Sequence, residues 1–272
     1  MWLNQHILTS AMEAEMVEED YIPEIPYVAA PDALRMYYGP RPYTHFEYSP
    51  ETGETSWCKF PEIISRESIE NSEKFLTNHA KAVLGDDTKI NAFVEHNQHL
   101  PELYYRGIFR HLCQDNALDT FVREQFDCTN KAQDIFFDKR MNRQINGKEM
   151  REIVDHLEHY GYYLLARTVH HYFNIKADNN WINSVIKPTL LSTYPAELAE
   201  NTFKFMTIPE PYNTWISSAD WSHLNAGQRF TDKEIFEQYL VAQDTYNDLY
   251  SPPASLGISP CKPEEFKETS YF

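Results

Sequence analysis

The stretch NGKEMREIVDHLEHYG, residues 146–161, carries helix signals at both of its ends. Asn146 is a favourable N-cap residue, and Glu149, three positions further on, completes a start of the capping-box kind. Apolar residues then recur with the helical period, and Gly161 is the residue type that commonly follows the end of a helix. Because YYLLARTVHHYFNI follows almost at once, we predict two helices that form an αα-hairpin.

Similar patterns extend towards the N-terminus and define a helical core over residues 65–175. Ser65 or Ser68 is suited to cap a helix that ends at Gly85, and Asp115 and Thr129 are suited to cap later helices. Pro101 separates two further helical stretches. The sequence therefore predicts a mainly α protein with an irregular core of short helices.

The regions on either side of this core are richer in proline and aromatic residues. We predict a short acidic helix from Leu8 through Met16, and then an extended arm over residues 21–64, where prolines repeatedly remove backbone donors. Residues 176–272 are expected to be loop-rich and helical, with an irregular tail. Thr231 and Glu234 form a second capping box there. The expected regions are thus 1–64, 65–175 and 176–272.

One small β-hairpin is predicted near residues 46–58. Pro50-Glu51-Thr52-Gly53 is suited to a four-residue turn, with glycine in the left-handed position. The pattern of Thr52, Gly53, Thr55 and Trp57 resembles the second hairpin of a WW domain. That resemblance implies a peptide-binding module, but the first tryptophan of the family is replaced by Leu34-Arg35-Met36.

The charge of the chain disfavours some classes of partner. The formal net charge is −17, and both ends are acidic while the middle is nearly balanced. An acidic field of this kind disfavours general binding to nucleic acids or anionic membranes. A local basic cluster, in which Arg140, Arg143 and Arg151 lie around the Asn146-Gly147 turn, is either an ordinary solvated helix junction or a docking patch for an acidic partner or an RNA backbone.

The scattered cysteines and the acidic N-terminal stretch predict an intracellular protein in a reducing compartment. The cysteines Cys58, Cys113, Cys128 and Cys261 are far apart and form no CxxC pair. No run of apolar residues is long enough for a membrane span, and the acidic start resembles neither a signal peptide nor a transit peptide. The cytosol is the expected compartment, with an organelle interior as the alternative.

The histidines, together with a nearby glutamate, are the candidates for a metal site. Two HxxH pairs fall on expected helices, where positions i and i+3 share a face. The candidate metal ligands are His96, His99, Glu152, His156, His159 and His170. Carboxylate–histidine metal sites in helical bundles use Glu-x-x-His pairs, and neither place has one. The competing interpretation is that these histidines lie at the boundary of amphipathic helices.

No recognised catalytic or phosphate-binding motif occurs in the chain, and no cofactor is expected. The leading hypothesis is therefore a non-catalytic accessory subunit of a larger protein assembly. Other protein subunits would dock on its aromatic arms and basic cluster. The candidate partner-binding residues are Tyr37, Tyr38, Tyr43, Tyr48, Trp57, Arg140, Arg143 and Arg151. The alternatives are a helical metal-dependent enzyme and a peptide-binding module.

Overall fold

A computed structural model describes most of the first 206 residues and a short later segment. The described residues are 3–16, 18–38, 40–49, 51–62, 64, 65, 67, 69, 77–81, 88–126, 134–204, 206 and 230–237. The main helices are α1 (Leu3–Met16), α2 (Ile25–Tyr38), α3 (Arg41–Thr44), α5 (Thr88–Asn97), α6 (Glu102–Phe126), α7 (Gly147–Phe173), α8 (Asn179–Trp181), α9 (Lys187–Thr193) and α10 (Ala196–Lys204). The strands are β1 (Tyr48–Ser49), β2 (Glu54–Cys58), β3 (Thr77–Lys81), β4 (Ile135–Asp138) and β5 (Arg143–Asn146). The mainly α class predicted from the sequence is confirmed.

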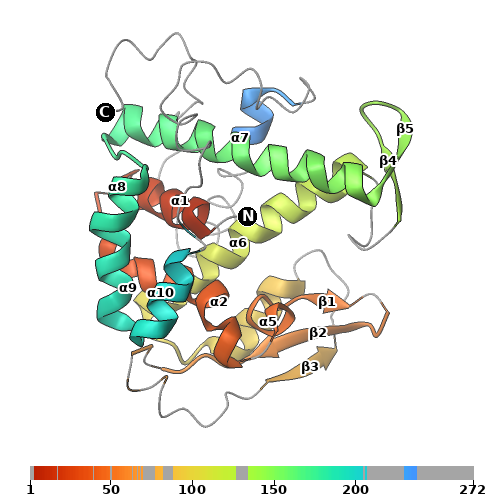
Figure 1. The fold of residues 1–272 in the computed structure, drawn as a ribbon. Helices are drawn as coiled ribbons and strands as arrows, with labels where there is room; N and C mark the ends of the chain where they lie inside the picture. Colours follow the sequence, from red (N-terminus) through yellow and green to blue (C-terminus); the bar gives the residue numbers. More distant parts are fainter. Residues whose placement is uncertain are drawn as a thin grey trace.

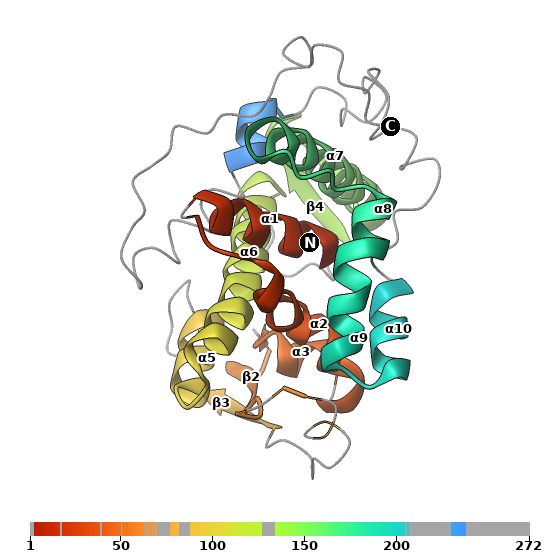
Figure 2. The same cartoon turned by 90° about the vertical axis from the view of Figure 1, so that its left-hand side faces the viewer.

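The N-terminal helix α1 lies inside the molecule, where it contacts α2, α6 and α7 (Figure 1). Its residues from Leu3 to Ala14 are all buried, although helices at the surface usually bury only one face. Helices α8, α9 and α10 run along one side, and the small sheet β1-β2-β3 lies at the end away from α7 (Figure 2). Among the described helices, none is both long and apolar enough to cross a bilayer.

The predicted hairpin is present, and it gains a third strand. Strands β1 and β2 pair antiparallel, with Tyr48 opposite Thr55, and Gly53 adopts a positive φ of 69° at the turn. Strand β3 pairs antiparallel with β2 on its other edge. The buried Asn97 side chain at the end of α5 holds this sheet in place, because it accepts from the Phe60 amide at 2.8 Å and donates to the Cys58 carbonyl at 3.0 Å.

The extended arm predicted for residues 21–64 is wrong where Ile25–Tyr38 and Arg41–Thr44 form helices. Helix α2 packs against α6 in the core. Pro26 lies in the first helical turn, where its missing N–H is not needed, and Pro31 is tolerated in the interior of the helix. Burial of Val28, Leu34 and their neighbours offsets the cost of about 3 kcal/mol that an interior proline carries.

Two helix boundaries predicted in the core are also wrong. Helix α7 runs through the buried Gly161 without ending, so that the αα-hairpin does not exist. Helix α6 runs through Asp115, which therefore caps nothing. A glycine costs only about 1 kcal/mol in a helix, which the packing of a long apolar stripe easily exceeds. The Asn146 cap is confirmed, because its side chain accepts from the Glu149 amide at 2.9 Å.

Two stretches predicted as helix contain strands. Residues 77–81 form β3, and residues 135–138 pair with 143–146 as the hairpin β4–β5. In β4 the side chains alternate between buried and exposed, which is the period of a strand packed on one face. Pairing with a neighbouring strand has overridden the local helical pattern in both places.

The C-terminal region is described only in part. Helix α10 begins directly after Pro195. The predicted capping box is present, because the Thr231 amide donates to Glu234 Oε2 at 2.8 Å. The predicted irregular tail lies outside the described residues.

Helices α2 and α6 approach each other closely at Gly107. A Cβ atom placed there would lie 2.7 Å from Tyr27 Cβ and 3.0 Å from the Val28 amide nitrogen. Only glycine allows this approach without a shift of the backbone. The contact fixes the distance between the two helices one turn away from His111, whose ring also binds the Val28 backbone.

Candidate metal centre

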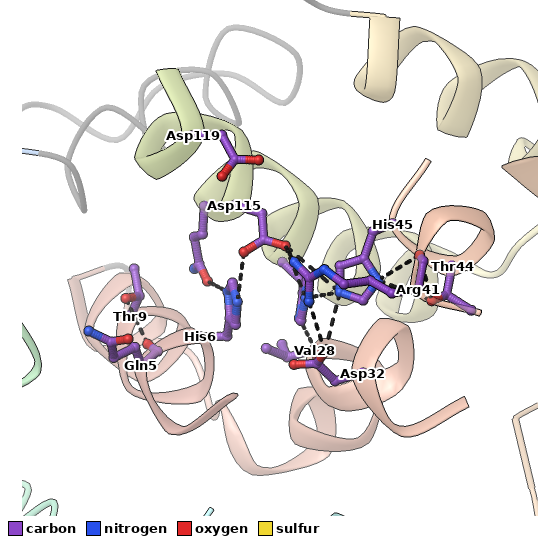
Figure 3. Close-up of polar contacts among 12 residues, drawn as sticks. Gln5, His6, Thr9, Val28, Asp32, Arg41, Thr44, His45, Asp115 and Asp119 are labelled. Carbon is purple, nitrogen blue, oxygen red and sulfur yellow. Dashed lines mark hydrogen bonds and ion pairs between the residues drawn. The ribbon is translucent and has the colours of Figure 1, made fainter. Parts of the chain in front are cut away.

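Three histidines and two aspartates meet in the interior between α1, α2 and α6 (Figure 3). His6 lies on α1, Asp32 on α2, His45 directly after α3, and both His111 and Asp115 on α6. We call these five residues the His–Asp cluster. The three histidines are fully buried, and the Asp115 side chain is 3% exposed.

Each imidazole of the cluster is oriented by a hydrogen bond from its Nδ1 atom. His111 Nδ1 donates to the Val28 carbonyl at 2.8 Å, and His45 Nδ1 lies 3.2 Å from the Arg41 carbonyl. His6 Nδ1 lies 2.7 Å from the side-chain oxygen of Gln114. Because a carbonyl oxygen only accepts, the contacts of His45 and His111 favour the tautomer in which Nδ1 carries the hydrogen. In the neutral imidazole, Nε2 then presents a lone pair.

The Nε2 atoms point towards the two carboxylates. His45 Nε2 lies 3.3 Å from Asp32 Oδ1 and 3.3 Å from His111 Nε2, and His6 Nε2 lies 3.4 Å from Asp115 Oδ1. His45 and His111 are each 3.8 Å from Asp115 Oδ2 through Nε2. Lone pairs that face one another at such distances repel, unless a proton or a metal ion lies between them.

The ionisation of the cluster leaves its donor atoms ready for a cation at neutral pH. Burial on its own would raise the pKa of Asp32, but the contact with His45 lowers it well below its usual range. Burial would likewise raise the pKa of Asp115, but its contact with His6 and the charge of Arg41 lower it. Burial lowers the pKa of both His45 and His111, which keeps these rings neutral. Ionised carboxylates and neutral imidazoles are the forms that bind metals.

Arg41 lies between the His–Asp cluster and the surface. Its Nη2 atom is 2.8 Å from Asp115 Oδ2, its Nη1 atom is 3.4 Å from Asp32 Oδ1, and its Nε atom is 3.0 Å from Glu47. The Arg41 side chain is 38% exposed, in contrast to the buried histidines. One guanidinium therefore balances part of the charge of three carboxylates, and the site remains negative.

A second group of buried charges joins the same helices a short distance away. Arg110 on α6 lies 2.6 Å from Glu24 Oε2 and 2.9 Å from Glu13 Oε2 on α1. Arg106 also pairs with Glu24, at 3.0 Å. The contact between Arg110 Nε and Glu13 Oε2 is an ion pair without the alignment of a hydrogen bond. Burial, the largest influence, raises the pKa of Glu13 to about 7 even though Arg110 lowers it.

The metal ligands considered from the sequence do not assemble with one another. Two groups of donor atoms close enough to share an ion were found among the described residues, and all of their members belong to the His–Asp cluster. His96 stacks on Trp57, and the His99 ring lies 2.8 Å from the Phe60 carbonyl. The remaining candidates are Glu152, His156, His159 and His170, which all lie on α7.

The residues considered for partner binding lie in several different places. Trp57 stacks on His96 with ring centroids 3.9 Å apart, Tyr43 packs against the core, and Tyr48 is exposed. Arg140 pairs with Glu234 and Arg143 pairs with Glu149, whereas Arg151 is an exposed residue of α7. The side chains of Tyr37 and Tyr38 lie outside the described residues. Docking at these residues remains a prediction.

Sequence reasoning missed the His–Asp cluster because its members are far apart in the chain. The only local signal is His111-x-x-x-Asp115, which places both residues on one face of a helix. His6, Asp32 and His45 stand in no recognisable spacing, and α2 was expected to be an extended arm.

Comparisons with known proteins identified no relative of this chain. No protein-family model matches it, and neither a curated protein nor a solved structure shows significant similarity.

Proposed function

We propose that this protein is a helical metal-dependent enzyme whose ion is held by Asp32, His45 and His111. The observation that carries the proposal is the orientation of the imidazoles. Their Nδ1 atoms bind backbone carbonyls, and their Nε2 atoms converge with Asp32 Oδ1. Ligating histidines in metalloproteins almost always donate their other ring N–H to such an acceptor. The rings of His45 and His111 are inclined by 70°, which suits two neighbouring positions on one ion.

Two histidines and one carboxylate suit iron, zinc or manganese. Three protein ligands leave further coordination positions open for water or a substrate. Asp32 and Arg41 are the partly exposed residues beside the site, and they mark the side from which a small molecule would approach. Bound in this site, the ion would supply Lewis-acid or redox chemistry, and Arg41 would hold the carboxylate ligands in place.

The test is to measure metal content and thermal stability in the purified full-length chain. After removal of metals by a chelator, addition of Zn²⁺, Mn²⁺ or anaerobic Fe²⁺ is expected to restore at least one ion per chain and to raise Tm. An ion present at about 100 times its Kd stabilises the folded state by about 2.7 kcal/mol. A chain that binds none of the three ions and keeps the same Tm would refute the proposal.

Matched variants show where the ion binds. His111→Ala and Asp32→Asn are expected to lose the ion, whereas His156→Ala, which removes an exposed histidine on α7, is expected to keep it. Asp32→Asn retains the shape of the side chain and is therefore expected to leave the fold intact. Circular dichroism verifies this. Retention of the full metal content in both cluster variants would contradict the proposed ligands.

The accessory subunit predicted from the sequence is a second proposal, and the hairpin β4–β5 favours it. Ile135, Phe137 and Met141 are 60%, 39% and 53% exposed, respectively. Exposed apolar side chains grouped on one element are typical of surfaces that bind other proteins. The aromatic residues Tyr27, Phe46 and Phe60 do not add to this proposal, because they pack inside the core of the chain itself.

Replacing Ile135 and Phe137 together by lysine is expected to abolish partner binding and leave the fold intact. Exposed substitutions usually change stability by no more than about 0.5 kcal/mol each. The measurement is quantitative cross-linking in an extract of the native source, with Gln144→Lys on the same hairpin as the control. Identical cross-linked products for all three proteins would argue against docking on this hairpin.

A further inference from the structure

The rings of His6 and His111 are stacked, and this limits what they can share. Their centroids are 3.7 Å apart and their planes are inclined by 15°. The lone pair of Nε2 lies in the plane of its ring. An ion bound equally by both rings would lie about half of that 3.7 Å separation outside each plane. A metal–nitrogen bond of about 2.0–2.1 Å cannot accommodate so large a displacement. His6 and His111 therefore cannot both coordinate the same ion with good geometry.

Asp115 turns its two oxygens towards different histidines. Its Oδ1 atom is 3.4 Å from His6 Nε2, and its Oδ2 atom is 3.8 Å from Nε2 of both His45 and His111. The Nε2 atom of His6 is completely buried and makes no hydrogen bond. A buried nitrogen of this kind costs free energy unless something binds it.

From this geometry we propose a second ion, held by His6 Nε2 and Asp115 Oδ1, so that the centre is dinuclear. Asp115 bridges the two ions, with Oδ2 directed at the ion of Asp32, His45 and His111. Carboxylate-bridged pairs of ions are typically about 3.5–4 Å apart. The inference rests on the proposed metal-dependent function, which requires only the first ion.

A second ion changes the chemistry that the site can perform. Two adjacent divalent cations bind both the attacking and the leaving oxygen of a displacement, or share a bridging water. The substrate class that fits is therefore an oxygen-rich group, such as a phosphoryl or carboxyl group. Arg41 is placed to contact such an anion, because its guanidinium lies against both carboxylates at the exposed side of the site.

The test is titration of the metal-free full-length chain with Mn²⁺, followed by elemental analysis and electron paramagnetic resonance. We expect two Mn²⁺ per chain, with the exchange-coupled spectrum of a close pair. Two ions with uncoupled spectra, or a single ion, would overturn the dinuclear centre and leave the proposed function standing. A chain that binds none of Mn²⁺, Zn²⁺ and Fe²⁺ would overturn both.

Variants identify the two positions separately. His6→Ala is expected to bind one ion and to show an uncoupled spectrum, whereas His156→Ala should keep the coupled pair. His6→Phe, which is larger and apolar, is a second variant in case the alanine cavity impairs folding. A coupled pair of ions that persists in folded His6→Phe would remove His6 from the site and overturn the inference.

Discussion

Replacing Arg110 with methionine is expected to lower the free energy of unfolding by about 3–5 kcal/mol at pH 8. The guanidinium is 5% exposed and lies between the carboxylates of Glu13 and Glu24, which are 3% and 1% exposed. Methionine fills a similar volume but removes the cation beside Glu13 and leaves Arg106 as the remaining cation beside Glu24, so that a buried carboxylate must either stay charged or take up a proton. Domains of ordinary stability have a total of only about 5–15 kcal/mol, so the loss is a large fraction. Urea unfolding followed by circular dichroism measures it.

Two comparisons separate the loss of charge pairing from the loss of packing. Arg151→Met, an exposed substitution on α7, is expected to change stability by less than about 0.5 kcal/mol. In the background of Glu13→Gln and Glu24→Gln, Arg110→Met should cost much less, because no buried carboxylate is then left unpaired. An equal cost in both backgrounds would show that packing, and not charge, dominates at Arg110.

Glu13 is expected to make the stability of the protein depend on pH. Its pKa is raised from 4.5 to about 7, chiefly by burial. A raised pKa means that the folded state holds its proton when the unfolded state has already lost it. The stabilisation from Glu13 is therefore complete below about pH 4.5, declines as pH rises, and is lost above about pH 7. The size of this change is about 3 kcal/mol.

Glu13→Gln removes this dependence. The stability of the variant minus that of the unmodified protein is expected to increase by up to about 3 kcal/mol between pH 4.5 and pH 8. His45 and His111 have lowered pKa values, so their contribution to stability rises as pH rises towards 6.5. Subtracting the stability of the unmodified protein removes this contribution, because both proteins share it. Glu152→Gln, an exposed change on α7, is the control. A difference that stays constant with pH would mean that Glu13 is ionised throughout the range.

The elements that could be predicted from the sequence are those specified by neighbouring residues. The Asn146 cap, the Gly53 turn and the Thr231 capping box each depend on contacts within about four positions, and all are present. Gly161 and Pro31 misled the prediction, because their local cost is small beside the packing of α7 and α2 in the core.

The candidate site could not be predicted in this way. Its donor atoms converge only after α1, α2 and α6 have packed, and a single pair, His111 and Asp115, is local in sequence. Reasoning from HxxH spacing selected histidines on α5, on α7 and in the turn after α5. The metal site that we propose therefore lies on residues that this reasoning did not consider.

The central position of α1 also has a consequence for how the chain matures in the cell. Gln5 donates to the carbonyl of Glu158 at 2.7 Å, across 153 positions of sequence. During synthesis α1 emerges long before α6 and α7, so its apolar residues Leu3, Ile7 and Leu8 have no complete binding site until α7 has left the ribosome. We therefore expect folding to include a late, non-local closure around an early segment, a kind of step that is intrinsically slow. Until that step the nascent chain presents α1 as a binding segment for chaperones.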